Sequence, residues 1–180
     1  MSKVGKSHIN VPSNIKVSVN GSEMLFEGGK NKVKYLIPEG IKVSFENSII
    51  IFSLANENNK DKFLDAIWGT TRANVNNIIK GLVKPFEKRI EFVGVGYRAS
   101  VSGRKIEMKL GFSHDVVIDI PDGIDVVAEK PTLLLFKSHD CQLLGNFVRK
   151  IQVYRKPEPY KGKGLIIDKQ YVYRKEGKKK

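Results

Sequence analysis

The chain has 180 residues, of which 41% are hydrophobic, so it is long and apolar enough to fold into one medium-sized domain or two small ones. Its 32 Lys and Arg residues outnumber its 19 Asp and Glu residues, and the resulting net charge of +13 favours a polyanionic partner, with nucleic acid first and an anionic membrane surface second. The single cysteine excludes an internal disulfide, and no apolar run approaches the roughly 20 residues that cross a bilayer, so we expect a cytoplasmic protein without a signal peptide or a membrane partner.

The first half of the chain predicts strands followed by a helix. Asn20-Gly21 lies between segments of alternating apolar and polar residues, a pattern typical of an antiparallel hairpin. The segment Ile37-Pro-Glu-Gly-Ile41 indicates a strand end, a tight turn and a new strand. We expect Asp61 or a preceding Asn to cap a helix whose apolar stripe lies in the core. The stripe comprises Leu64, Ile67, Trp68, Thr71, Val75, Ile78 and Leu82.

The second half repeats these signals in the same order, at an offset of about 80 residues. Ser102-Gly103 corresponds to the first hairpin turn, Ile120–Ile124 to the first Ile-Pro-acid-Gly-Ile segment, and Leu133–Phe136 to the apolar run at 49–52. A second helix is expected after Ser138 or Asp140, either of which can cap it. Its stripe comprises Leu143, Leu144, Phe147, Val148 and Ile151, and Pro157 and Pro159 stop it.

These patterns predict an α+β fold of two tandem duplicated domains, each an antiparallel sheet packed on one helix, followed by a basic C-terminal tail. We expect the first repeat at residues 1–82, the second at 83–155 and the extended tail at 156–180. Residues 145–180 carry 12 basic and three acidic side chains, a net +9. A disordered, solubilising tail would explain this charge as well as an RNA-binding one.

No group of residues predicts catalysis or metal binding. The histidines, His8, His114 and His139, are far apart and lack zinc-ligand spacing to Cys141. Cys141 lies near a predicted helix start but has no defined partner that would make it a nucleophile, so a semi-buried structural role is expected. We therefore predict a protein that is not an enzyme and has no cofactor, metal or small-molecule substrate.

The segment Gly94-Val-Gly-Tyr-Arg-Ala99 fits the glycine spacing of a dinucleotide site, but a predicted strand follows it where that site needs a helix. We expect a bulged strand edge on which Tyr97 offers a stacking ring and Arg98 a phosphate-binding guanidinium to RNA. A bulge that only curves the sheet would explain the same glycines.

A second basic cluster surrounds the end of the second helix. Arg149, Lys150, Arg155 and Lys156 precede the octet Pro157-Glu-Pro-Tyr-Lys-Gly-Lys-Gly164. The two prolines favour a stiff, extended path, while Tyr160 can stack on a base and Lys161 and Lys163 can meet phosphates. Gly162 would allow the backbone to turn closely around the partner.

Several of these motifs resemble the bacterial large-subunit ribosomal protein L6 family over nearly the whole chain. The matching segments are residues 1–6, 11–12, 94–99, 110–114, 157–164 and 174–178. The resemblance implies a duplicated α+β fold that supports translation by binding large-subunit (23S-type) ribosomal RNA, chiefly through the second domain and tail. It also implies a place near the stalk base and the sarcin–ricin loop, beside neighbouring ribosomal proteins, with the first domain facing outward.

The resemblance carries RNA contacts to Tyr97, Arg98, Lys156, Tyr160, Lys161 and Lys163, and more loosely to Arg149, Arg155 and Lys175. The chain departs from the family after the octet, where Ile166 and Ile167 replace the usual basic and aromatic residues. For residues 165–173 we expect either an apolar contact with the core or another protein, or an RNA contact. The alternative function is a free-standing RNA-binding protein or RNA chaperone.

Overall fold

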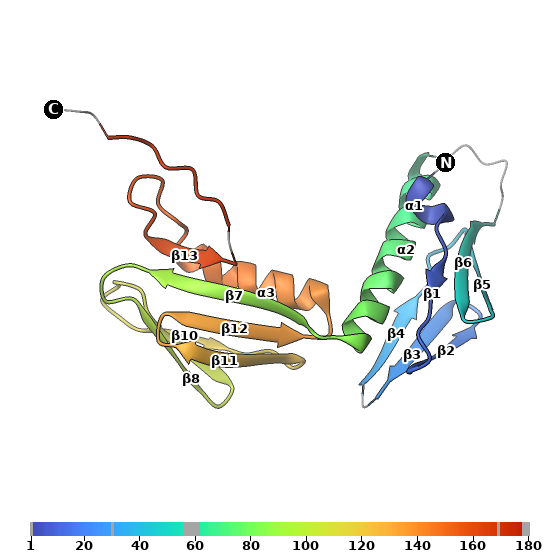
Figure 1. The fold of residues 1–180 in the computed structure, drawn as a ribbon, viewed down its shortest axis with the longest axis horizontal. Coiled ribbons are helices and arrows are strands. Elements are labelled where there is room, and N and C mark those ends of the chain that lie inside the picture. Colours follow the sequence, from blue (N-terminus) through green and yellow to red (C-terminus); the bar gives the residue numbers. More distant parts are fainter. Residues whose placement is uncertain (1, 30, 56–61, 169, 178–180) are drawn as a thin grey trace. The chain divides into compact units, whose positions relative to one another are not determined.

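The computed structural model describes residues 2–29, 31–55, 62–168 and 170–177 (Figure 1). Asp61 and the asparagines before it, which were expected to cap the first helix, lie outside the described residues, as do the lysines at 178–180. The chain divides into two compact units, Met1–Pro85 and Phe86–Lys180. Each unit is described by itself.

The first unit contains two three-stranded antiparallel sheets and a long helix. One sheet has the strand order β2-β3-β4 and the other β1-β6-β5. The elements are α1 (Lys3–Lys6), β1 (Ile9–Asn10), β2 (Ile15–Asn20), β3 (Glu23–Gly28), β4 (Asn31–Leu36), β5 (Ile41–Glu46), β6 (Ile49–Leu54) and α2 (Lys62–Val83).

The core of the first unit lies between the apolar stripe of α2 and the inward faces of the strands. Trp68 and Val75 on the helix are buried with Met24, Phe26 and Phe52 on the strands. The indole Nε1 of Trp68 donates a hydrogen bond to the Phe52 carbonyl at 3.0 Å, which satisfies its one polar group inside the core. Trp68 is therefore a core residue, as its spacing predicted.

The second unit has a three-stranded sheet of order β10-β9-β8 and a four-stranded sheet of order β11-β12-β7-β13, and neighbouring strands in both sheets run antiparallel. Helix α3 packs against the four-stranded sheet (Figure 1). The elements are β7 (Phe86–Val93), β8 (Arg98–Ser102), β9 (Lys105–Lys109), β10 (Val116–Asp119), β11 (Ile124–Lys130), β12 (Leu133–Ser138), α3 (Cys141–Tyr154) and β13 (Gly164–Ile167).

The two units repeat one topology, which confirms the predicted duplication and the α+β class. The β2–β3 and β8–β9 hairpins turn at Gly21 and Gly103, whose φ angles are +60° and +58°. The Ile37 amide donates to the Ser22 carbonyl at 2.8 Å, and the Ile120 amide makes the equivalent bond to Arg104 at the same distance. Strands β7, β12 and β11 occupy the places of β1, β6 and β5.

Helix α3 begins and ends where the sequence indicated. Asp140 is its N-cap, since the carboxylate oxygen Oδ1 accepts from the amides of Gln142 and Leu143 at 2.8 and 3.2 Å. Ser138, the other predicted cap, instead accepts a hydrogen bond from the Asp140 amide and donates one to the Gly123 carbonyl. The helix ends at Tyr154, before the two prolines.

The predicted extended tail from residue 156 onward differs from the structure. Residues 164–167 form β13, which pairs with β7 and makes the edge of the four-stranded sheet. Leu165 is fully buried and belongs to the core of the second unit, while Ile167 packs against that core. The apolar run at 165–167 therefore turns inward, because burying it is more favourable than leaving it in water.

Candidate nucleic-acid interface

The octet forms a closed loop between α3 and β13, not the extended path that its prolines suggested. The Leu165 amide donates to the Arg155 carbonyl at 2.9 Å, and within the loop the Glu158 amide donates to the Lys163 carbonyl at 2.8 Å. The Gly162 amide donates to the Glu158 carbonyl at 3.1 Å. Because β13 must return to the end of α3 to pair with β7, residues 157–164, the octet loop, fold back on themselves.

The octet loop presents its cationic side chains to solvent. Lys156, Lys161 and Lys163 are exposed, and Tyr160 is 56% exposed. None of the three lysines forms an ion pair with an acidic residue among those that the structure describes. The loop therefore combines a fixed backbone with cations that have no counter-ion in the described parts of the chain.

The C-terminal segment, residues 170–177, folds back onto the octet loop. The Lys175 amide donates to the Pro159 carbonyl at 2.7 Å. One residue earlier, the guanidinium of Arg174 lies over Gly162, where a Cβ would be only 3.1 Å from Nη2. Figure 1 shows this segment, in red, running beside the loop that joins α3 to β13. Lys175 and the octet lysines thus belong to adjacent segments.

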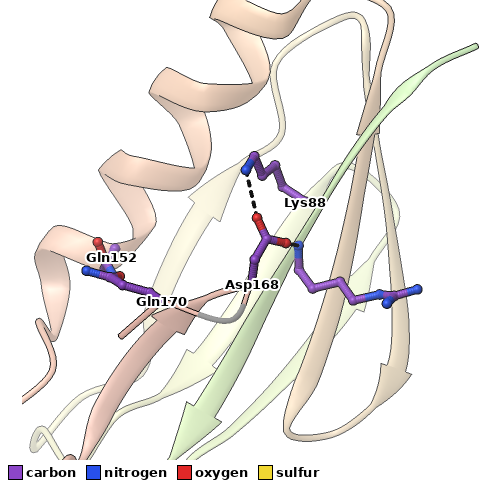
Figure 2. Close-up of polar contacts among 5 residues, drawn as sticks. Lys88, Gln152, Asp168 and Gln170 are labelled. Carbon is purple, nitrogen blue, oxygen red and sulfur yellow. Dashed lines mark hydrogen bonds and ion pairs between the residues drawn. The ribbon is translucent and has the colours of Figure 1, made fainter. Parts of the chain in front are cut away.

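Asp168 redirects the chain at the end of β13 (Figure 2). Its carboxylate pairs with Lys88 Nζ at 2.7 Å and accepts from the Arg89 amide at 2.9 Å, while its own amide donates to the Arg89 carbonyl at 2.7 Å. Its φ of +49° makes the turn. Partial burial acts to raise the pKa of Asp168, but the hydrogen bonds and charges of Lys88 and Arg89 hold the pKa below its ordinary value.

Gln152 ties α3 to β13 and to the segment beyond it. This side chain is 1% exposed, and its Nε2 donates to the Leu165 carbonyl at 2.9 Å and to Gln170 Oε1 at 2.8 Å. Figure 2 shows the Gln152 and Gln170 side chains next to each other. Its Oε1 accepts a hydrogen bond from Arg149. Arg149, predicted as an RNA contact, therefore also holds a buried glutamine in place, a role that the sequence did not indicate.

Tyr97 follows a tight turn and not the predicted bulge. The Tyr97 amide donates to the Gly94 carbonyl at 3.3 Å, and Gly96 has a φ of +76°. The half-buried ring packs against the core and covers Gly94, where a Cβ would be 2.9 Å from it. The glycine at 94 thus makes room for Tyr97, and a ring packed in this way is a poor candidate for stacking on a base.

Arg155 joins this turn to the end of α3. Its Nε donates to Tyr97 Oη at 3.0 Å, and its Cζ lies 5.2 Å from the centroid of the Phe112 ring. Phe112 in turn stacks on His114. Arg98, by contrast, is an exposed residue in a recess that it shares with Ser100, Glu107, Lys109, Asp115 and Pro131, none of them from the octet loop.

The described part of the chain contains no group of His, Cys, Asp or Glu residues that could hold a metal ion. None of its helices combines the length and the apolar character of a membrane span. Strand β8 follows the glycines at 94 and 96, as predicted, where a dinucleotide site would need a helix. Cys141 is exposed, whereas a semi-buried position was expected.

Comparison with known proteins agrees with the duplicated fold. The model of the family "Ribosomal protein L6" matches the chain twice, at residues 11–84 and 93–166. Proteins named "Large ribosomal subunit protein uL6" from Rhodopseudomonas palustris and Methylocella silvestris are each 42% identical to it, and one from a Bradyrhizobium species is 39% identical. Each alignment covers 180 residues and the whole of both chains. The chain therefore belongs to the ribosomal protein L6 family.

Proposed function

We propose that this chain is a structural constituent of the large ribosomal subunit that binds 23S-type ribosomal RNA, chiefly through the second unit. Members of the family are structural ribosomal proteins and not enzymes, and the relatives carry the large subunit in their names. The observation that carries the RNA-binding part is the octet loop, whose exposed lysines pair with no acid among the described residues and stand on a backbone closed by hydrogen bonds.

A closed loop is better suited to RNA than a mobile tail of the same charge. In a mobile tail, each lysine must be ordered at the moment of binding, and that entropy opposes association. In the octet loop the backbone is already fixed at Arg155, Glu158 and Lys163, so only side chains need to be ordered. Lys161 and Lys163, on either side of Gly162, can then reach separate phosphates.

The motifs shared with the family support a more specific placement. We propose that the second unit lies near the stalk base and the sarcin–ricin loop, in contact with neighbouring ribosomal proteins, and that the first unit faces outward and contacts RNA less. The charge distribution agrees with this assignment, because residues 145–180 carry a net +9 of the total +13. The protein would then work in the cytoplasm as part of the ribosome.

Sedimentation through a high-salt gradient tests the proposal against a free-standing RNA-binding protein or RNA chaperone. An integral constituent stays with the large subunit, whereas a protein held only by non-specific phosphate contacts dissociates as salt rises. Hydroxyl-radical footprinting of subunits with and without the protein would then identify the protected RNA. Complete release in high salt, or no protected nucleotides, would contradict the proposed function.

A further inference from the structure

We infer that Arg174 is a phosphate-binding residue of the same RNA surface as the octet loop. We also infer that its guanidinium is positioned against Gly162, where the missing side chain leaves room for it. This inference deepens the proposed function and rests on it. The basic segment 174–178 already resembled the family, and the inference gives Arg174 within it a defined position. It also assigns to Gly162 a different role from a close approach of RNA to the backbone.

The position of Arg174 is set by hydrogen bonds on both sides of it. Upstream, Asp168 is held by Lys88 and Arg89, and Gln170 is held by Gln152 and by the Ile167 carbonyl at 3.0 Å. Downstream, the Lys175 amide donates to the Pro159 carbonyl at 2.7 Å. The backbone that carries Arg174 is therefore anchored to the four-stranded sheet of the second unit, to α3 and to the octet loop.

The contact with Gly162 depends on the missing side chain. A Cβ at this position would lie 3.1 Å from Nη2, 3.2 Å from Nε and 3.4 Å from Cζ of Arg174. All three atoms belong to the guanidinium, so the planar group lies over the glycine, and a Cβ here would push it away by a few tenths of an ångström. The backbone itself also favours glycine, since its φ is +69°.

The surroundings of Arg174 are positively charged and favour the binding of an anion. Its side chain is exposed and pairs with no acid in the described ranges, while Lys161, Lys163 and Lys175 lie on the two segments that meet at this point. Glu158 and Glu176 lie on the same segments, but the cations outnumber them, so the local charge is positive and a bound phosphate relieves the remaining repulsion. A guanidinium can meet two oxygens of one phosphate at once, which suits Arg174 to the centre of the group.

The test is filter binding of the full-length chain to full-length large-subunit ribosomal RNA over a salt series. Arg174→Gln should weaken binding and reduce the magnitude of the log–log salt slope by about one unit, as expected for one lost phosphate contact. Arg174→Lys should keep the slope but lose part of the affinity, because an ammonium lacks the fork of the guanidinium.

Gly162→Asn should reproduce the effect of Arg174→Gln, because the new side chain displaces the guanidinium, and the double variant should be no worse than either single one. Asn tolerates positive φ better than other residues with side chains. The matched control is Gly103→Asn, since Gly103 has a φ of +58° and nothing within 4 Å of an added Cβ. The control should bind RNA as the parent chain does.

The outcomes separate the inference from the proposed function. If the parent chain binds, and Lys161→Gln and Lys163→Gln weaken it while Arg174→Gln does not, the inference is wrong and the proposed function stands. Independent, additive effects of Gly162→Asn and Arg174→Gln would also overturn it, since they would show that the glycine does not act through the arginine. A parent chain that fails to bind would overturn both.

Discussion

Replacing Leu165 by Ala tests whether β13 is an integral strand of the second unit. Leu165 is fully buried and belongs to the core that includes Ile90, Phe136 and Ile151. Buried Leu→Ala replacements cost about 2–5 kcal/mol of unfolding free energy, depending on how well the site can collapse. Because β13 is a four-residue edge strand that can shift inward, we expect the lower half of this range, about 2–3 kcal/mol.

The assay can observe the two units separately. Trp68 is the single tryptophan of the chain and lies in the core of the first unit. Its fluorescence during denaturation with urea therefore reports on the first unit, while far-UV circular dichroism reports on both. Leu165→Ala should lower the midpoint of the second-unit transition and leave the Trp68 midpoint unchanged.

Ile166→Ala is the matched control on the same strand, since Ile166 is only partly buried and lies outside the core cluster. It should cost clearly less than Leu165→Ala. Equal, small losses of unfolding free energy in the two variants would show that residues 164–167 leave the sheet readily. Strand β13 would then not be an integral part of the core.

Three further predictions concern the end of β13 and the octet loop. Asp168→Asn should lower the free energy of unfolding at neutral pH by about 0.5–1 kcal/mol, a value that allows for solvent screening. Because the pKa of Asp168 is lowered in the folded chain, the difference from the parent chain should shrink as pH falls below the ordinary Asp value of about 3.9. Denaturation over a pH series would show this change. Replacing Lys161 and Lys163 together by Ala should reduce the magnitude of the salt slope of RNA binding by roughly one to two units, measured by filter binding, and an unchanged slope would remove both from the interface. Tyr160→Ala should cost about 1–3 kcal/mol of binding free energy through lost stacking with the slope nearly unchanged, and no loss of affinity would count against stacking.

Local signals in the sequence were sufficient to predict most of the elements. Gly21 and Gly103 stand between alternating strands, and the hairpin turns occur at both. The stripe containing Trp68 predicted the buried face of α2, and Asp140 was one of two residues expected to cap α3. These features follow from the period of a strand or helix and from turn and cap chemistry within a few residues.

The candidate site was predicted less well, because its contacts join distant parts of the chain. The RNA contacts of Lys161 and Lys163 stay a prediction, and the sequence also suggested a stiff, extended octet and a stacking ring at Tyr97. The ring is instead packed over Gly94 and bound by Arg155, 58 residues away. No local pattern contains such a pairing, so these features could not be inferred without the fold.

By itself, the sequence determined the two-fold repeat, the α+β class and the concentration of positive charge near the C-terminus. Only the tertiary structure decided that residues 164–167 complete a sheet, that the Gln152 side chain donates a hydrogen bond to this strand, and that the Arg174 guanidinium lies over Gly162. The physical reason is burial. With Leu165 in the core and its amide bonded to the Arg155 carbonyl, the two ends of the octet lie close together and the octet forms a closed loop. The segment that follows is then turned by Asp168 back onto the octet loop, so that charge from two separate stretches of sequence gathers on one surface.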